Sequence, residues 1–225
     1  MRGAGRRSTS RTRSSCTTPN AEPRTSIGVL GGTFDPVHIG HVVTARQARV
    51  KAGLDRVWLM PNARPPHRAE APRASAEDRL AMVRLAVQDF PELGACDLET
   101  RRGGTSYTID SMRALERAHP DLSFTLLLGY DVARAIATWH RADELLKTTR
   151  IVVFNRAGEA PVDEAALEEL GFRPGQTALI EIASPPIAGH DIRGRLERGD
   201  SIEGLVPAAV LSYISTHGLY RTPVG

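Results

Sequence analysis

Short apolar runs alternate with helical segments along most of this 225-residue chain, and this alternation constrains the fold more than any other feature. Apolar runs of four to eight residues bounded by turn residues are typical of buried strands. They occur at residues 26–30, 56–60, 95–98, 123–129, 150–154 and 178–182. Helical patterns occur at residues 39–52, 75–89, 106–118, 131–147 in two pieces, 162–170, 190–198 and 206–217. The order predicts an α/β protein, a single domain with a Rossmann-like, doubly wound parallel sheet.

Residues 1–25 differ from the rest of the chain in composition. They contain six arginines, one acid (Glu22) and many Ser and Thr. Because such a segment has too little apolar surface to pack, we expect a disordered extension before a folded domain at residues 26–225. Its Arg- and Ser-rich, acid-poor composition is also found in transit peptides. It lacks an amphipathic apolar stripe, so a dispensable extension is the favoured interpretation.

Charge, hydropathy and cysteine content limit the partners of the domain. Subtracting the extension's net charge of +5 from the chain's +3 leaves −2 for residues 26–225, which argues against a nucleic-acid partner. No apolar run approaches the roughly 18 residues that span a membrane. Cys16 and Cys96 form no disulfide framework, which fits a reducing compartment. These features predict a cytoplasmic protein without a membrane partner, and the sequence does not determine its oligomeric state.

The stretch "GVLGGTFDPVHIGHVVTARQ" (28–47) predicts a strand, a glycine turn and a helix. The first turn of a helix carries unpaired N–H donors and the positive end of the helix dipole, so an anion fits there. Gly31 and Gly32 allow a close approach, and His38 and His41 project from one face of the first turn. The spacing matches neither a dinucleotide loop nor a P-loop. A metal site is the disfavoured alternative, because no further ligands stand at a recognisable spacing.

Polar residues follow the other predicted strands, where ligands of doubly wound sheets bind. The loops read "PNARPPHR" (61–68), "LETRRGGTSYTID" (98–110), "GYDVARAIATWHRADEL" (129–145), "NRAGE" (155–159) and "SPPIAGHDIRGRL" (184–196). Asp35 precedes a proline, and its roles as a turn former and as a substrate contact stay open. Trp139 is interpreted as a stacking partner for a ring rather than as core. Arg68 and Arg156 are interpreted as anion contacts.

These motifs resemble the bacterial nicotinate-nucleotide adenylyltransferases of the nucleotidyltransferase superfamily. The resemblance covers about residues 26–220. It rests on "GGTFDPVHIGH" (31–41), on Pro65–Arg68, on Ser106–Asp110, on Gly129 with Asp131 and Trp139–Arg141, and on the terminal "LVPAAVLSYISTHGLY" (205–220). One motif departs: where the family usually has Ile-Ser-Ser-Thr before the last Ile-Arg, this chain has Ile187, Ala188, Gly189 and His190. The hydroxyls that would face a triphosphate are missing, whereas Arg193 is retained.

The resemblance implies an enzyme that joins ATP and nicotinate mononucleotide to give nicotinate adenine dinucleotide and pyrophosphate. Mg²⁺ would enter with ATP, and no protein side chain would ligate a metal. Catalytic roles fall to His38, His41 and Arg193. ATP contacts fall to Gly31, Gly32, Thr33, Phe34, His38, Gly40, His41, Gly129, Asp131, Arg156, Ile187, His190 and Arg193. Nicotinate-nucleotide contacts fall to Thr33, Phe34, Arg68, Tyr107, Thr108, Trp139, His140 and Arg141.

Two alternative functions stay open at this point. One is a related adenylyl- or cytidylyltransferase with another phosphorylated acceptor, such as phosphopantetheine. The other is a nucleotide-binding regulator whose catalysis has decayed through the change at residues 188–190. Trp139–Arg141 and Ser106–Thr108 favour the pyridine nucleotide over another acceptor. The intact His38 and His41 argue against a decayed site.

Overall fold

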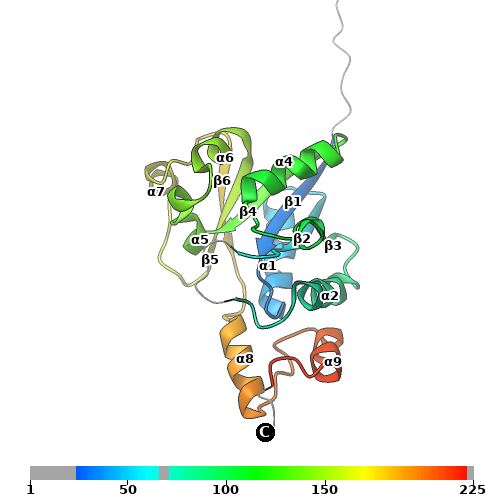
Figure 1. Cartoon of the computed structure of the whole chain (residues 1–225). Coiled ribbons are helices and arrows are strands. Elements are labelled where there is room, and N and C mark those ends of the chain that lie inside the picture. The colour runs from blue at the N-terminus through cyan, green and yellow to red at the C-terminus, as the bar shows by residue number, and fades with distance from the viewer. Residues whose placement is uncertain (1–23, 66–70, 222–225) are drawn as a thin grey trace, which may run out of the picture.

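A computed structural model of the chain describes residues 24–65 and 71–221. The expected extension at residues 1–25 therefore lies almost entirely outside the described residues, and so does Arg68. Six strands form one parallel sheet: β1 (Thr25–Gly32), β2 (Arg56–Pro61), β3 (Leu93–Ala95), β4 (Leu122–Gly129), β5 (Arg150–Arg156) and β6 (Thr177–Ile182). Their spatial order is β3-β2-β1-β4-β5-β6, so the order reverses between β1 and β4 (Figure 1). The predicted doubly wound parallel sheet is confirmed.

The helices largely follow the predicted pattern. They are α1 (Ile39–Lys51), α2 (Ala76–Val87), α3 (Leu98–Arg102), α4 (Thr108–Ala118), α5 (Tyr130–Ala133), the 3₁₀ helix η1 (Ile136–Thr138), α6 (Ala142–Thr148), α7 (Glu164–Glu169), α8 (Gly189–Arg198) and α9 (Ala208–Thr216). Ser75 caps α2 as its position suggests, because its side chain accepts a hydrogen bond from the Asp78 N–H. The segment predicted as two helical pieces at residues 131–147 is α5, η1 and α6.

The third strand is the clearest error of the sequence prediction. The run at residues 95–98 was expected to be a strand, but β3 ends at Ala95 and α3 begins at Leu98. Cys96 still donates a backbone hydrogen bond to the Leu59 carbonyl at 2.9 Å, and the chain then turns. A strand of three residues at a sheet edge carries too weak a period-two pattern to fix its bounds.

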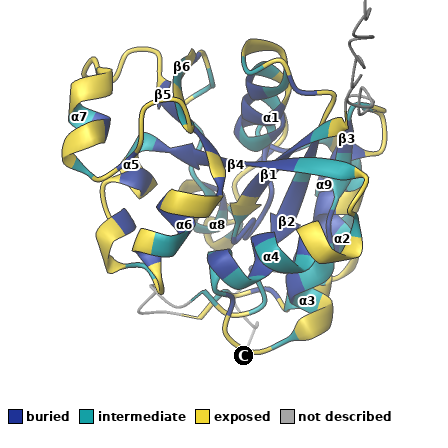
Figure 2. Cartoon of the chain, turned by 90° about the horizontal axis from the view of Figure 1, so that it is seen from above, coloured by how far each residue is buried: buried dark blue, intermediate teal, exposed yellow. Residues whose placement is uncertain are grey.

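Two hydrophobic clusters cover the two faces of the sheet, as the central strands show. In β4, Leu126 and Leu128 join one cluster and Leu127 joins the other, because successive side chains of a strand point to opposite faces. One cluster contains buried residues of α1, α2, α8 and α9. The other contains buried residues of α4, η1, α6 and α7. Figure 2 shows buried strands between helices whose outer surfaces are exposed.

Helices α8 and α9 lie at the end of the molecule toward which the strands run (Figure 1). Ile192 of α8 and Val210 and Ile214 of α9 are buried in the cluster that they share with α1 and α2. The Leu205 carbonyl, between α8 and α9, accepts a hydrogen bond from the Ile39 N–H at the start of α1 at 2.9 Å. The C-terminal region is therefore packed onto the loop that follows β1. Within the described residues, none of the helices has the length and apolarity needed to cross a membrane.

Candidate active site

A cavity of about 420 Å³ lies at the carboxyl ends of β1, β4 and β5 and extends to the start of α8. This is where the strand order reverses, the usual ligand position in a doubly wound sheet. The residues expected to contact ATP line it, with the exception of Gly40: Gly31, Gly32, Thr33, Phe34, His38, His41, Gly129, Asp131, Arg156, Ile187, His190 and Arg193. Thr33 and Phe34, also expected at the acceptor, belong to the same wall. The tertiary structure thus brings together residues from four segments distant in sequence.

His38 and His41 form a close pair at the N-terminus of α1. His38 stands at the N-cap position and His41 lies in the first turn. Their ring centroids are 3.7 Å apart, and the His38 N–H donates to Nδ1 of His41 at 3.2 Å. Because Nδ1 of His41 accepts this bond, the N–H of its neutral ring is on Nε2. The first turn therefore offers the His41 imidazole as a donor, whereas the backbone N–H groups of Ile39 and His41 already donate to the carbonyls of Leu205 and His38.

Both histidines are neutral at neutral pH. Burial, and then the positive charge of Arg156, lowers the pKa of His38 to about 4. The pKa of His41 also lies well below its ordinary value, first through burial and then through unfavourable electrostatic interactions of its protonated form with His38 and Arg156. Desolvation disfavours the charged imidazolium. The pair therefore presents neutral donors until a negative charge arrives to stabilise protonation.

Close packing around the histidine pair explains two residues of the motif. A side chain at Gly40 would place its Cβ 3.0 Å from Nδ1 of His38, so glycine lets the ring lie over the first turn of the helix. This is a positioning role, and Gly40 does not line the cavity. Phe34 has a left-handed φ of 50°, and its buried ring meets His41 edge-on at a centroid distance of 4.9 Å. The ring therefore fixes one side of the pair.

Two arginines bring positive charge to the cavity. Arg193 on α8 donates from Nη1 to the backbone carbonyl of Asp35 at 2.7 Å. Arg156, at the end of β5, is about half exposed and lies 3.8 Å from the Glu159 carboxylate. Among the described residues, Nε of Arg193 and Nδ1 of His38 are buried side-chain nitrogens without a hydrogen-bond partner. Buried polar atoms usually have partners, so these two atoms suit a site that binds a polar ligand.

Asp35 lies at the cavity wall, where hydrogen bonds within the protein hold its carboxylate. It is buried, and its carboxylate accepts hydrogen bonds from the backbone N–H groups of Arg73 at 2.9 Å and Ala74 at 3.1 Å. The Tyr220 hydroxyl donates a third hydrogen bond at 2.8 Å. Protein donors therefore occupy this carboxylate. The two roles left open by the sequence, turn former and substrate contact, stay predictions.

The departing segment at the start of α8 also reaches the cavity. Ala188 is the N-cap residue of α8, and Gly189 is its first residue. A Cβ at Gly189 would lie 3.2 Å from the carbonyl oxygen of Asp35, so glycine permits this close approach of helix and loop. His190 lines the cavity, yet its side chain is 76% exposed and its Nε2 lies 3.3 Å from the Asp191 carboxylate. Contact between His190 and ATP stays a prediction.

Residues expected at the acceptor lie at the start of α4 and just after η1. Both elements bury residues in the same hydrophobic cluster. The rings of Tyr107 and His140 lie 4.3 Å apart, and Arg141 bridges to Asp110 at 3.4 Å. Trp139 is half-buried against the cluster beneath α4, and Thr108 begins α4. None of Tyr107, Thr108 or Trp139–Arg141 is among the described residues that line the 420 Å³ cavity. The structure thus joins the two acceptor motifs to each other, and their contact with a pyridine ring stays a prediction.

Sequence reasoning missed Arg79, whose side chain is fully buried. Its guanidinium donates to the Thr33 carbonyl at 2.8 Å, the Asn62 side chain at 3.3 Å and the Ala63 carbonyl at 3.2 Å. It therefore ties the loop after β1 to the loop after β2. The available signal was its position in α2 one turn before buried Met82 and Val83, where an apolar residue would be expected.

No group of three or more His, Cys, Asp or Glu side chains suited to holding a metal ion occurs within residues 24–65 and 71–221. Two carboxylates line the cavity together with the histidine pair: Asp35, which protein donors hold, and Asp131.

Comparison with known proteins extends this picture. The cytidylyltransferase-like family matches residues 29–195. The probable nicotinate-nucleotide adenylyltransferase of Salinibacter ruber is 39% identical over 198 residues, 87% of this chain and 98% of the relative. The corresponding Symbiobacterium thermophilum protein is 41% identical over 86% of this chain and 94% of the relative.

Solved structures show the same fold at lower identity. Plasmodium falciparum nicotinic acid mononucleotide adenylyltransferase complexed with NaAD has a TM-score of 0.72 at 20% identity and covers 87% of this chain and 97% of its own. A putative nicotinate-nucleotide adenylyltransferase from Vibrio parahaemolyticus has a TM-score of 0.61 at 17% identity, over 87% and 95%.

Proposed function

This chain belongs to the nicotinate-nucleotide adenylyltransferases of the cytidylyltransferase-like family, and on that premise we propose that it transfers the adenylyl group of ATP to nicotinate mononucleotide. The observation that carries the proposal is the neutral histidine pair at the start of α1, with Arg156 and Arg193 on the same cavity. These side chains stabilise negative charge on phosphate oxygens, and none of them is an activated nucleophile. Adenylyl transfer needs this charge stabilisation and does not need a protein nucleophile.

The reaction needs positioning and charge stabilisation rather than covalent catalysis. An oxygen of the acceptor's 5′-phosphate forms a bond to the α-phosphorus of ATP, while the bond from that phosphorus to the oxygen bridging to the β-phosphorus breaks. Pyrophosphate leaves with the electron pair. Charge spreads over the phosphate oxygens in the transition state, where fixed donors have their largest effect.

His38, His41 and Arg193 are the proposed catalytic residues. Nε2–H of His41 donates to phosphate oxygens, His38 lies beside it at the start of α1, and Arg193 adds a positive charge from α8. Arg156 contributes a second charge at the mouth of the cavity. Because folding has already ordered these donors, little reorganisation is needed when charge develops.

The ATP-using transferases of this family generally need a divalent cation, and we propose that Mg²⁺ fills this role. Bound by the phosphates, it would neutralise charge and let two anions approach. No side chain of the described residues is assigned to it. We further propose that Trp139 stacks on the nicotinate ring while Tyr107, Thr108, His140, Arg141 and Arg68 surround the acceptor.

The test is an assay of pyrophosphate release with ATP and, in separate reactions, nicotinate mononucleotide, nicotinamide mononucleotide or phosphopantetheine. We expect the highest kcat/KM with nicotinate mononucleotide and identify the dinucleotide product by mass. Excess EDTA should abolish turnover, and added Mg²⁺ should restore it. Preference for phosphopantetheine would assign the chain to another acceptor, and ATP binding without turnover on any acceptor would indicate a nucleotide-binding regulator.

A further inference from the structure

We infer that Asp35 and Tyr220 are positioning residues that set the place of Arg193 against the nucleotide phosphates. The inference deepens the proposed function, since it rests on Arg193 contacting ATP. The sequence left Asp35 open as a turn former or a substrate contact, and it assigned Tyr220 no role in the site. The evidence is a buried hydrogen-bond network that joins four separate segments of the chain.

Asp35 is the centre of this network. Its carboxylate, 4% exposed, accepts from the backbone of Arg73 and Ala74, which lead into α2, and from the Tyr220 hydroxyl. Its backbone carbonyl accepts from Nη1 of Arg193, which also lies 3.8 Å from the carboxylate. A single residue of the β1–α1 loop thus holds α8, the approach to α2 and the C-terminal segment.

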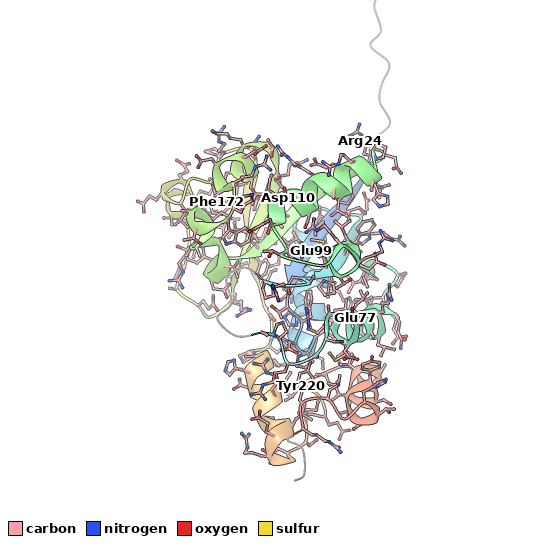
Figure 3. All side chains as sticks on the ribbon, viewed as in Figure 1. Arg24, Glu77, Glu99, Asp110, Phe172 and Tyr220 are labelled. Carbon is pink, nitrogen blue, oxygen red and sulfur yellow. The ribbon has the colours of Figure 1, made fainter. Side chains whose placement is uncertain are left out.

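Tyr220 fixes the carboxylate side of this network. The residue is buried and has a left-handed φ of 65°, which a non-glycine residue seldom adopts without a local reason. Burial, and then the Asp35 charge, raises the pKa of its hydroxyl, so the group keeps its proton and donates. Figure 3 shows Tyr220 where the α8–α9 end meets the rest of the molecule.

Asp35 connects this hydrogen bond to Arg193, because it accepts from both the Tyr220 hydroxyl and Nη1 of Arg193. A carboxylate that is held by Tyr220 keeps the loop carbonyl of Asp35 in one place, and that carbonyl orients the guanidinium. Gly189 permits the required contact, because its missing side chain leaves room beside the same carbonyl. Arg73 adds an ion pair with Glu197 on α8. Removing the Tyr220 hydroxyl should therefore loosen Arg193 while leaving the histidine pair in place.

The chain contains a matched control in Tyr213 of α9. Its hydroxyl donates to the Asp78 carboxylate at 2.9 Å, so it too joins the C-terminal region to α2 through a Tyr–Asp hydrogen bond. Asp78 is not among the described residues that line the cavity. Tyr213→Phe therefore removes a tyrosine hydroxyl that donates to an aspartate between the C-terminal region and α2. Tyr220→Phe removes a hydroxyl that donates to Asp35, which also contacts Arg193.

The experiment measures binding of a non-hydrolysable ATP analogue by calorimetry in the full chain, so it does not depend on the acceptor. We expect Tyr220→Phe to weaken analogue binding about fivefold, the lower end of typical coupling between sites, and Tyr213→Phe to change it less than about twofold. In an Arg193→Lys background the effect of Tyr220→Phe should disappear. Thermal unfolding of each variant shows that it is folded.

Equal affinity of wild type and Tyr220→Phe would overturn the inference, as would equal weakening by both tyrosine variants or an undiminished effect in the Arg193→Lys background. If Tyr220→Phe did not fold, Asp35→Asn would test the same coupling, again with and without Arg193→Lys. Analogue binding with the expected pattern but no dinucleotide product would retain the inference and reject the acceptor. Absence of any analogue binding would reject both.

Discussion

The two sides of the proposed site are built in different ways. On the phosphate side, His38, Asp35 and Phe34 are buried. The backbone N–H of His38 donates to His41, and the backbone carbonyl of Asp35 accepts from Arg193. On the acceptor side, His140 and Arg141 are exposed, and Arg141 is held by ion pairs with Asp110 and Glu144. Exposed ion pairs contribute about 0–1 kcal/mol each, whereas buried networks are costly to disturb.

This difference suggests that the phosphate side stabilises the transition state and that the acceptor side selects the substrate. Donors that act on the transition state gain from being fixed before the substrate arrives. Contacts that select a ring gain from side chains able to adjust as it enters. Changes on the phosphate side should therefore lower kcat or stability, and changes on the acceptor side should raise one KM.

The largest effect is expected from removing a histidine of the pair. His41→Ala and His38→Ala should each lower kcat by about 100- to 1,000-fold, as loss of a preorganised donor typically does, with little change in the acceptor's KM. Steady-state kinetics with both substrates measure this. His140→Ala is the matched control on the acceptor side, where kcat should stay within about tenfold of wild type. Comparable kcat values for His41→Ala and wild type would remove the pair from the chemistry.

The next effect concerns pH and stability. Both histidine pKa values are lowered in the folded state, so the unfolded chain binds more protons as pH falls below about 6.5. The free energy of unfolding should therefore decrease from pH 6.5 toward pH 5, by roughly 1–2 kcal/mol for each histidine. Above pH 6.5 the free energy of unfolding should return to its full value. Urea unfolding at several pH values measures it.

The pH comparison has its own control. Replacing both His38 and His41 by Asn should flatten the pH dependence between 6.5 and 5, because the groups that bind the extra protons are gone. Replacing the exposed His140 by Asn should leave the slope in place. If the slope survived loss of the buried pair, its origin would lie elsewhere in the molecule.

Trp139→Ala should have an effect that is confined to the acceptor. Loss of ring stacking should raise the KM for nicotinate mononucleotide by the equivalent of about 1–3 kcal/mol, by analogy with bases stacked on aromatic side chains. The KM for ATP should change little. Trp139→Phe retains an aromatic face and should recover part of the loss. A change in the KM for ATP alone would indicate that Trp139 packs with η1 and does not contact the acceptor.

The smallest effect is expected at His190. Its side chain is 76% exposed, so a hydrogen bond to phosphate there competes with water. His190→Thr, which restores a hydroxyl, should change the KM for ATP by less than about threefold, at the low end for a neutral hydrogen bond. Arg193→Ala in the same assay is the comparison and should act at least tenfold more strongly, since its charge is partly desolvated. A large effect at His190 would move the triphosphate toward the mouth of the cavity.

The sequence by itself determined the architecture and the residues around the cavity. Strand and helix periodicities are local, so six strands and the main helices were predictable before any packing was known. The histidines were identifiable because a glycine turn followed by a helix leaves free N–H groups at a known point of the chain. Bounds of β3 and the presence of α3 were not predictable, because each has too few residues for a periodic signal.

Only the tertiary structure decided which side chains support the site. Asp35 and Tyr220 are 185 positions apart in sequence, and Arg79 joins two loops that meet only when β1 and β2 pair. The low pKa of His38 arises from burial and from Arg156 on β5, and neither is encoded near His38. Desolvation and hydrogen bonding act between atoms that folding brings within a few ångströms. They are therefore properties of the packed chain rather than of any local pattern.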